Sequence, residues 1–156
     1  MKILIVEDQP NHMEEAVAVL NSAGVEFVSA TNQVEATSFL YDHKEGKIRL
    51  DGVITDVFMP HADRAPWDEA DQPCGLRVKI QAEKFGLPCI MCTAGHHHGA
   101  KYEWINGLCR FMGWEMVDGY PDGDIYHDEA PHKRWSSALA FLQTQISLRI
   151  IKDLTS

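Results

Sequence analysis

Three acidic side chains and one hydroxyl stand where apolar runs of the sequence end. Apolar runs of this length are typical of strands that are buried on both faces of a sheet. In an open parallel α/β sheet, ligands bind outside the carboxyl ends of the strands. We therefore expect chemistry at four residues that end three separate runs: Glu7 and Asp8, then Asp56, then Thr93.

The residue types at these positions favour a divalent cation and a phosphoryl group. If the strands lie side by side, the carboxylates of Glu7, Asp8 and Asp56 repel one another unless a cation neutralises them. Carboxylate oxygens suit Mg²⁺, which keeps several waters and binds substrate phosphate. A carboxylate beside Mg²⁺ can attack a phosphoryl group and form an aspartyl phosphate, and Thr93 could donate a hydrogen bond to a phosphoryl oxygen. The alternative is that the acids are solvated turn residues and that Thr93 makes only a local backbone bond.

Strands and helices must alternate along the chain to position these side chains. Apolar runs predict strands at residues 2–6, 25–30, 50–56, 87–93 and 114–117. Helical spacing and capping residues predict helices that start near residues 10 and 33, then helices over 75–85, 101–112 and about 132–154. Strict alternation predicts a parallel sheet with helices on both faces, as one α/β domain over residues 1–156 with three layers in a doubly wound arrangement.

Composition and charge exclude several classes of partner. Hydrophobic residues make up 45% of the 156, enough for a core, yet no apolar run approaches the ~20 residues that span a bilayer. Two acids follow the first apolar run too early for a secretory signal, so we expect a cytoplasmic protein without membrane contact. The net charge of −9 disfavours direct binding of nucleic acid.

A CxxC pair, Cys89 and Cys92, lies within a predicted strand. Residues three apart on a strand point to opposite faces of the sheet, which does not suit a redox or zinc pair. We expect free thiols that act as small buried hydrophobes, with redox or metal use as the alternative.

Four short motifs resemble the receiver domain of two-component response regulators. Their order and separations also fit that family, and the resemblance covers about residues 1–121, with the last helix in its expected place. The matching motifs are Ile5-Val6-Glu7-Asp8, Thr55-Asp56-Val57-Phe58-Met59-Pro60, Gly75-Leu76 and Cys92-Thr93-Ala94.

The resemblance implies a flavodoxin/CheY-like fold with a five-stranded parallel sheet in the order 2-1-3-4-5. It implies a stand-alone receiver, not an enzyme, that accepts a phosphoryl group from a histidine kinase or a phosphotransfer protein and signals through a downstream protein partner. It also implies the site residues: Asp56 as phosphoacceptor, Glu7, Asp8, Asp56 and the Phe58 backbone carbonyl as Mg²⁺ ligands, and Thr93 as the switch hydroxyl.

The sequence departs from the family after the fifth strand, where receivers carry a Lys-Pro pair whose lysine contacts the phosphoryl group. Counting from Gly113 puts Tyr120-Pro121 there, and tyrosine offers no positive charge. Losing a charge-assisted hydrogen bond costs ~1.5–3 kcal/mol. Lys133 could fold back as a substitute, but we expect an atypical receiver that lacks the usual lysine. Val117 also stands where an aromatic switch residue is usual, and the loop over residues 61–73 is unusually long.

Two further functions stay open. A pseudo-receiver would use the fold as a protein-interaction module without phosphorylation, which the missing lysine favours. A metal-dependent phosphatase or hydrolase would reuse the acidic pocket, which the long loop and several histidines suggest. Trp67, in that loop, could cover the pocket or pack on the adjacent helix. These histidines could bind a transition metal, but they show no ligand spacing and are more typical of exposed loops: His12, His61, His96, His97, His98, His127 and His132.

The last two helices carry apolar stripes. The stripe of Trp104, Ile105, Leu108 and Phe111 predicts a face packed on the core. The last helix is longer than one sheet face requires; we expect Leu139 and Leu142 in the core. Its end, with Ile150 and Leu154, could instead contact a partner or form a homodimer.

Overall fold

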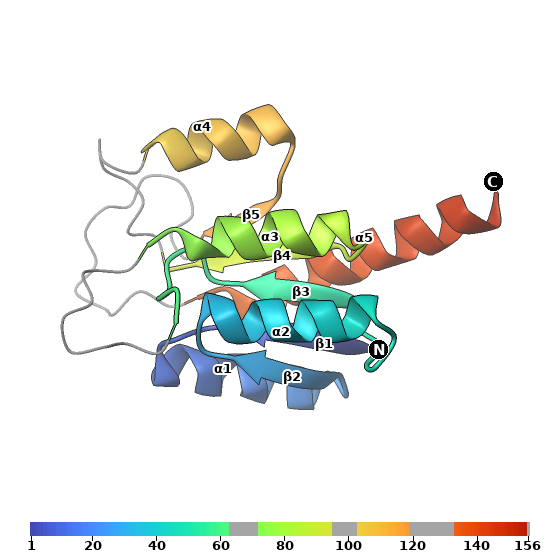
Figure 1. Ribbon diagram of the computed structural model, residues 1–156, viewed down its shortest axis with the longest axis horizontal. Helices are drawn as coiled ribbons and strands as arrows, with labels where there is room; N and C mark the ends of the chain where they lie inside the picture. Colours follow the sequence, from blue (N-terminus) through green and yellow to red (C-terminus); the bar gives the residue numbers. More distant parts are fainter. Residues whose placement is uncertain (63–71, 95–102, 119–132, 156) are drawn as a thin grey trace.

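The computed structural model describes residues 1–62, 72–94, 103–118 and 133–155, and all statements below concern these residues (Figure 1). The described strands are parallel and form one sheet in the order β2-β1-β3-β4-β5. The sequence-based prediction of the fold and of the strand order is therefore confirmed. The strands are β1 Lys2–Val6, β2 Glu26–Ala30, β3 Gly52–Thr55, β4 Cys89–Thr93 and β5 Met116–Asp118.

Helices cover both faces of the sheet. Two apolar clusters, one on each face, join α1 and α5 to one side of the strands and α2 and α3 to the other. A third, smaller cluster joins α3 to α4 at the β4 and β5 side. Each strand therefore contributes alternate residues to the two sides. The helices are α1 Pro10–Ser22, α2 Gln33–Lys44, α3 Cys74–Lys84, α4 Glu103–Met112 and α5 Trp135–Leu154.

The two cysteines of the CxxC pair show this alternation. Cys89 lies in the cluster under α2 and α3, whereas Cys92 lies in the cluster under α1 and α5. Both thiols are free and fully buried, and burial raises the pKa of each to about 12. The prediction that they serve as buried hydrophobes is confirmed, because a thiol of this pKa forms almost no thiolate near neutral pH.

Capping decides where α2 begins. The side chain of Asn32 accepts a hydrogen bond from the backbone N–H of Glu35 at 2.9 Å, as the sequence predicted. In α3, Lys79 is buried and Ile80 is exposed. The ammonium of Lys79 is satisfied in the interior, where it donates to the carbonyl oxygen of Cys89 at 2.7 Å and to Glu83 at 2.8 Å.

The expected core stripe of α4 is only half correct. Ile105 and Cys109 are buried, but Trp104 is 50% exposed and Phe111 is 86% exposed. A helix that packs on a sheet through residues four apart leaves the rest of its surface to solvent, and Ile105 and Cys109 supply that contact here.

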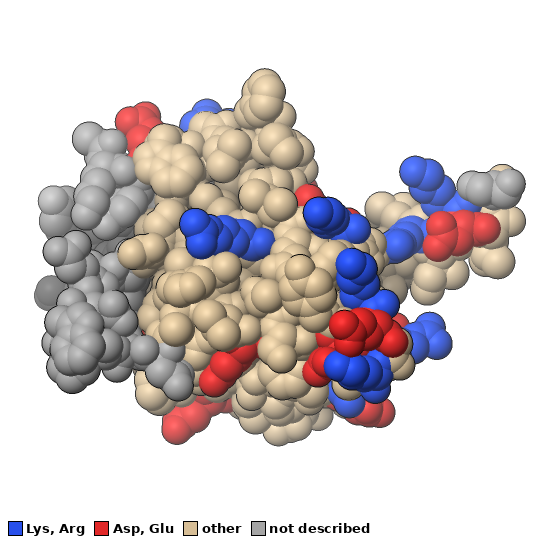
Figure 2. Space-filling view, in the orientation of Figure 1, with Lys and Arg blue, Asp and Glu red and all other residues tan. Residues whose placement is uncertain are grey.

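The last helix extends beyond the sheet. Its first turns pack on the core through Trp135, Leu139 and Leu142, which confirms the expected contact of the latter two. The final turns project away from the body (Figure 1), and both basic and acidic side chains are visible on the projecting end (Figure 2). Within the described parts of the chain, no helix combines the length and the apolar character that crossing a membrane requires.

Candidate functional site

The register of two central strands brings Glu7 and Asp56 together. Val6 of β1 pairs with Thr55 of β3, so the residues that follow each strand leave the sheet side by side. The backbone N–H of Asp56 donates to the carbonyl oxygen of Val6 at 2.8 Å, which fixes this arrangement. The carboxylates of Glu7, Asp8 and Asp56 lie within 4.8 Å of one another. The acid cluster expected from the sequence is therefore present.

The backbone around Asp56 is held from two sides. The hydroxyl of Thr55 donates to the carbonyl oxygen of Asp56 at 2.9 Å, and the N–H of Gly75 donates to the carbonyl oxygen of Val57 at 3.0 Å. A Cβ added to Gly75 would lie 1.8 Å from the carbonyl oxygen of Asp56. The first turn of α3 therefore packs directly on the chain next to Asp56, and only glycine leaves the space for it.

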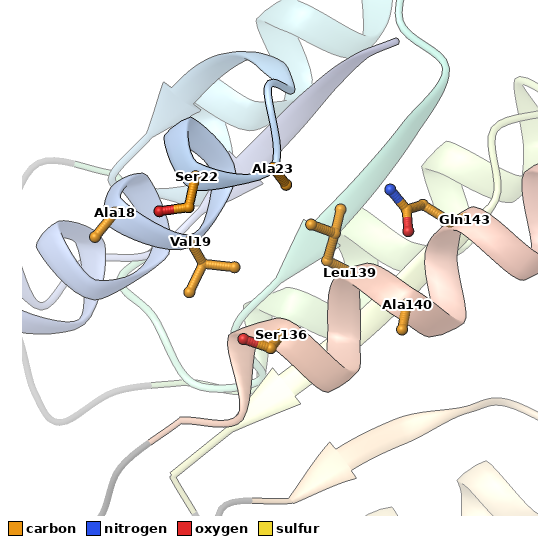
Figure 3. A pocket seen from close by; sticks show the side chains of 8 residues that line it. All are labelled: Ala18, Val19, Ser22, Ala23, Ser136, Leu139, Ala140 and Gln143. Carbon is orange, nitrogen blue, oxygen red and sulfur yellow. The ribbon is translucent and has the colours of Figure 1, made fainter.

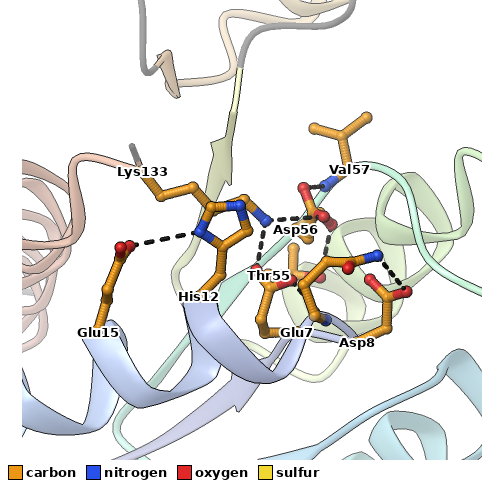
Figure 4. Close-up of polar contacts among 9 residues, drawn as sticks. Glu7, Asp8, His12, Glu15, Thr55, Asp56, Val57 and Lys133 are labelled. Carbon is orange, nitrogen blue, oxygen red and sulfur yellow. Dashed lines mark hydrogen bonds and ion pairs between the residues drawn. The ribbon is translucent and has the colours of Figure 1, made fainter. Parts of the chain in front are cut away.

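Backbone N–H groups orient the carboxylates. Val57 donates its N–H to Oδ1 of Asp56 at 2.6 Å, and Gln9 donates its N–H to Oε1 of Glu7 at 3.0 Å. The side chain of Gln9 also donates to Oδ2 of Asp8 at 3.2 Å. Glu7 and Asp56 are buried, whereas Asp8 is partly exposed. The pocket therefore presents the carboxylates of two buried residues beside that of a partly exposed one (Figure 4).

A lysine completes the pocket, and it is Lys133. Its Nζ donates to Oε2 of Glu7 and lies 2.8 Å from Oδ2 of Asp56, with the side chain 1% exposed (Figure 4). Trp135, in the first turn of α5, is buried two residues further on, and its ring centroid lies 5.7 Å from the ammonium. The expectation that no lysine serves the acid cluster is wrong.

The error has a physical cause. The count that reached Tyr120-Pro121 assumed a short connection after β5, whereas residues 119–134 separate the end of β5 from the start of α5. Loops accept extra residues at little entropic cost, so spacing measured across them is unreliable. Counting back from the apolar start of α5 at Trp135 would have found Lys133. Tyr120-Pro121 itself lies outside the described residues.

The charges of the pocket are strongly coupled. Burial, and next the negative charge of Asp56, raise the pKa of Glu7 to about 7 against the opposing effect of Lys133. Burial likewise raises the pKa of Asp56, while Lys133 and the N–H groups of Val57 and Phe58 act against it. Burial disfavours the ammonium of Lys133, but the two carboxylates outweigh it and raise its pKa. Lysine therefore stays charged while Glu7 exchanges a proton near neutral pH.

The donor set fits a hard divalent cation. Three carboxylates and one ammonium leave a formal excess of negative charge, and the ligand atoms that the cluster offers to a metal are oxygens. Among the described residues this is the one group of three or more acidic, histidine or cysteine side chains close enough to hold an ion. Phe58 contributes an N–H to Asp56, and the role of its carbonyl as a ligand stays a prediction.

The hydroxyl expected at the site is at the correct edge. Thr93 is buried and is the last residue of β4, where it pairs with Asp118 of β5. Thr55, the last residue of β3, pairs with Met91 of β4. Thr93 follows Met91 by two residues on β4, so it lies beyond the end of β3, on the side of Asp56. Val117, at the usual aromatic switch position, is buried in the core.

Neither His12 nor His61 belongs to the group of acidic side chains that could hold an ion. His12 contacts Glu15, with Nδ1 3.4 Å from Oε2, and His61 lies 2.9 Å from the side-chain oxygen of Gln33. The other loop histidines (His96, His97, His98, His127 and His132) and Trp67 lie outside the described residues.

Sheet order and helix placement define the flavodoxin/CheY-like fold, and many solved receiver domains share it with this chain. A response regulator receiver protein from Sinorhizobium medicae is 16% identical, with a TM-score of 0.59 and 96% of each chain covered. A receiver domain protein from Clostridium thermocellum is 18% identical, with a TM-score of 0.55 over 99% of this chain and 98% of that one.

The chemotaxis response regulator CheY4 of Vibrio cholerae is 20% identical, with a TM-score of 0.52 over 92% of this chain and 96% of that one. No family model matches the chain, and no curated protein matches it in sequence. At these identities the comparisons establish the fold, and the function has to be argued from the pocket.

Proposed function

We propose that this protein is a response-regulator receiver that accepts a phosphoryl group on Asp56. The observation that carries the proposal is the position of Lys133, whose ammonium contacts both Asp56 and Glu7 in a buried pocket. A buried cluster of charges costs folding stability, so three carboxylates with a lysine at the end of parallel strands indicate a functional site. These side chains are suited to phosphoryl transfer. The donor would be a phosphorylated histidine of a kinase or phosphotransfer protein.

In the proposed step, a carboxylate oxygen of Asp56 attacks the phosphorus of the phosphohistidine. The P–O bond forms as the P–N bond breaks, and the departing imidazole takes a proton from solvent. Mg²⁺, held by Glu7, Asp8, Asp56 and the Phe58 carbonyl, would neutralise charge on the transferring group. The N–H of Val57 holds Oδ1 of Asp56 in place.

Lys133 would pair with the new phosphoryl group instead of with the carboxylate it contacts now. The transferred group adds negative charge beside Asp56, so the ammonium gains a stronger partner there. Because Lys133 stands two residues before the buried Trp135, any shift of its backbone reaches the first turn of α5. Thr93 would donate its hydroxyl to another phosphoryl oxygen. The changed surface would then be bound by a downstream protein.

One of the two other candidates has lost support. A pseudo-receiver was favoured by the missing lysine, and Lys133 removes that argument. A phosphatase or hydrolase requires a general base, and Glu7, whose pKa burial raises to about 7, could serve as one, so the experiment below also tests this candidate.

Binding of beryllofluoride, a phosphoryl mimic, tests the proposal. Calorimetric titration should show binding to the protein only when Mg²⁺ is present, and Asp56→Asn should abolish it. Asp51→Asn is the control, because Asp51 lies at the opposite end of the sheet, where it accepts a hydrogen bond from the N–H of Lys2. Absence of binding by the unchanged protein would favour the pseudo-receiver, and turnover of a phosphate ester would favour the hydrolase.

A further inference from the structure

A surface groove lies between α1 and α5, on the face of the sheet that these two helices cover (Figure 3). Its volume is about 520 Å³, and it is open to solvent along one side. Small side chains form much of its wall, namely Ala18, Ser22 and Ala23 of α1 with Ser136 and Ala140 of α5. Because these side chains are short, large apolar side chains can enter between the two helices.

The projecting end of α5 carries side chains of that kind. Ile150 is 55% exposed, Ile151 is 57% exposed and Leu154 is 81% exposed. They follow one another within the last two turns of the helix, past the region where it contacts the sheet. Contiguous exposed apolar side chains on a soluble protein mark an interaction site.

The groove and the projecting side chains belong to one continuous face of α5. Residues three and four apart lie above one another on a helix. Residues at these spacings run from the groove to the projecting end in the order Ser136, Ala140, Gln143, Ser147, Ile150 or Ile151, and Leu154. The side chains on this face are therefore small near the start of α5 and large near its end.

We propose that this face joins two copies of the chain, with their α5 helices antiparallel about a two-fold axis near Gln143. Ile150 lies about two turns after Gln143, and Ser136 lies about two turns before it. Antiparallel pairing therefore places Ile150 and Ile151 of each copy in the groove of the other, and Leu154 follows toward the start of the partner's α5. The same patch serves both copies, as a two-fold interface requires.

The size of the contact supports a second copy as the occupant. Burial of the three large side chains and the groove on both copies covers on the order of 1,000 Å², the lower limit for a specific interface. Pairing also explains the length of α5, because its final turns project beyond the body of their own domain and would reach the partner's α1 and α5. Interfaces near this lower limit are typical of weak, reversible complexes, so we expect dimerisation to depend on protein concentration.

Sedimentation velocity over a concentration series tests the dimer. The unchanged protein should pass from monomer to dimer, whereas Ile151→Glu should weaken dimerisation by at least about tenfold, because it buries a charge. Ala18→Trp, which fills the groove from α1, should have the same effect. Leu148→Glu is the matched control, since Leu148 is also exposed on the projecting turns but lies on another side of the helix. It should leave the dimer intact.

Crosslinking locates the two-fold axis. All four native cysteines are buried, so Gln143→Cys introduces one exposed thiol, which should form a disulfide-linked dimer on mild oxidation. Thr144→Cys, exposed on the adjacent side of the helix, should crosslink much less. A protein that remains monomeric at all concentrations would overturn the proposal and leave the groove to a different protein. A dimer that is unaffected by Ile151→Glu and Ala18→Trp would overturn the assigned surface.

Discussion

The ammonium of Lys133 lies 2.8 Å from Oδ2 of Asp56 and also donates to Glu7. Glu7 is near the start of the sequence, whereas Lys133 is close to its end. This relationship connects the first strand, the third strand and the segment that enters α5. It gives the acid cluster a positive charge. It also joins the proposed site of phosphorylation to the helix that the dimer proposal uses.

Lys133→Met should destabilise the protein. The substitution leaves Glu7 and Asp56 buried without a counter-charge, and breaking a buried ion pair costs ~3–5 kcal/mol. Urea unfolding well above pH 7, without divalent cations, should show a loss of this order. Addition of Mg²⁺ should restore part of it. Lys84→Met removes an exposed lysine from the end of α3 and should have little effect. A fully stable Lys133→Met protein would contradict the ion pairs described here.

Stability without divalent cations should fall as the pH rises toward 7. The pKa of Glu7 is raised from 4.5 to about 7 in the folded protein, so the folded state binds this proton more tightly than the unfolded state does. The resulting stabilisation is complete below pH 4.5 and is lost as the pH rises through 7. A shift of this size corresponds to about 3 kcal/mol.

Glu7→Gln isolates this contribution. The variant has no carboxyl group to titrate at position 7, so its unfolding free energy should vary less than that of the unchanged protein between about pH 4.5 and 7. Urea unfolding at a series of pH values measures both curves. Parallel curves for the two proteins would show that the proton on Glu7 is not linked to folding.

Gly75→Ala should damage both the fold and the site. The new Cβ would meet the carbonyl oxygen of Asp56 at 1.8 Å, so α3 or the Asp56 backbone must move. We expect a loss of about 3 kcal/mol or more in stability, together with weaker Mg²⁺ binding. Gly107→Ala in α4 is the control, because nothing lies within 4 Å of its added Cβ. That change should be neutral or slightly stabilising. Equal behaviour of the two variants would contradict the close packing of α3 on Asp56.

Trp135 should report on the pocket by fluorescence. Its ring lies 5.7 Å from the ammonium of Lys133, so movement of Lys133 toward a bound phosphoryl mimic changes the charge beside the indole. Mg²⁺ with beryllofluoride should alter the emission of the unchanged protein. Trp135→Phe and Lys133→Met should both remove this change, whereas Trp104→Phe, a substitution on the half-exposed face of α4, should keep it. A response that survives Trp135→Phe would show that another tryptophan is the reporter.

The fold and the acids of the site could be predicted because they depend on local signals. Strand and helix periods alternate along the chain, and Glu7 and Asp56 stand directly after apolar runs, so the parallel sheet brings them together without further information. Lys133 could not be placed in this way. Its position depends on where a long connection returns, so a count forward from β5 misses it and only a count back from the start of α5 reaches it.

The helical spacing of apolar residues also does not determine which side chains of a helix are buried. Phe111 fits the apolar stripe of α4, yet it is exposed because the contact of this helix uses only the side of Ile105 and Cys109. Lysine is typical of the surface, yet Lys79 is buried, and its ammonium donates to the buried carbonyl oxygen of Cys89 and to the exposed carboxylate of Glu83. These outcomes depend on tertiary partners, which a single helical segment does not contain.

Covalent labelling of Asp56 is the most direct test of the proposed function. The protein is incubated with acetyl phosphate and Mg²⁺, and its intact mass is measured together with those of Asp56→Asn and Asp51→Asn. We predict the mass gain of one phosphoryl group in the unchanged protein and in Asp51→Asn, and none in Asp56→Asn or when Mg²⁺ is removed. A protein of unchanged mass, or a gain that Asp56→Asn retains, would contradict the assignment of Asp56 as the phosphoacceptor.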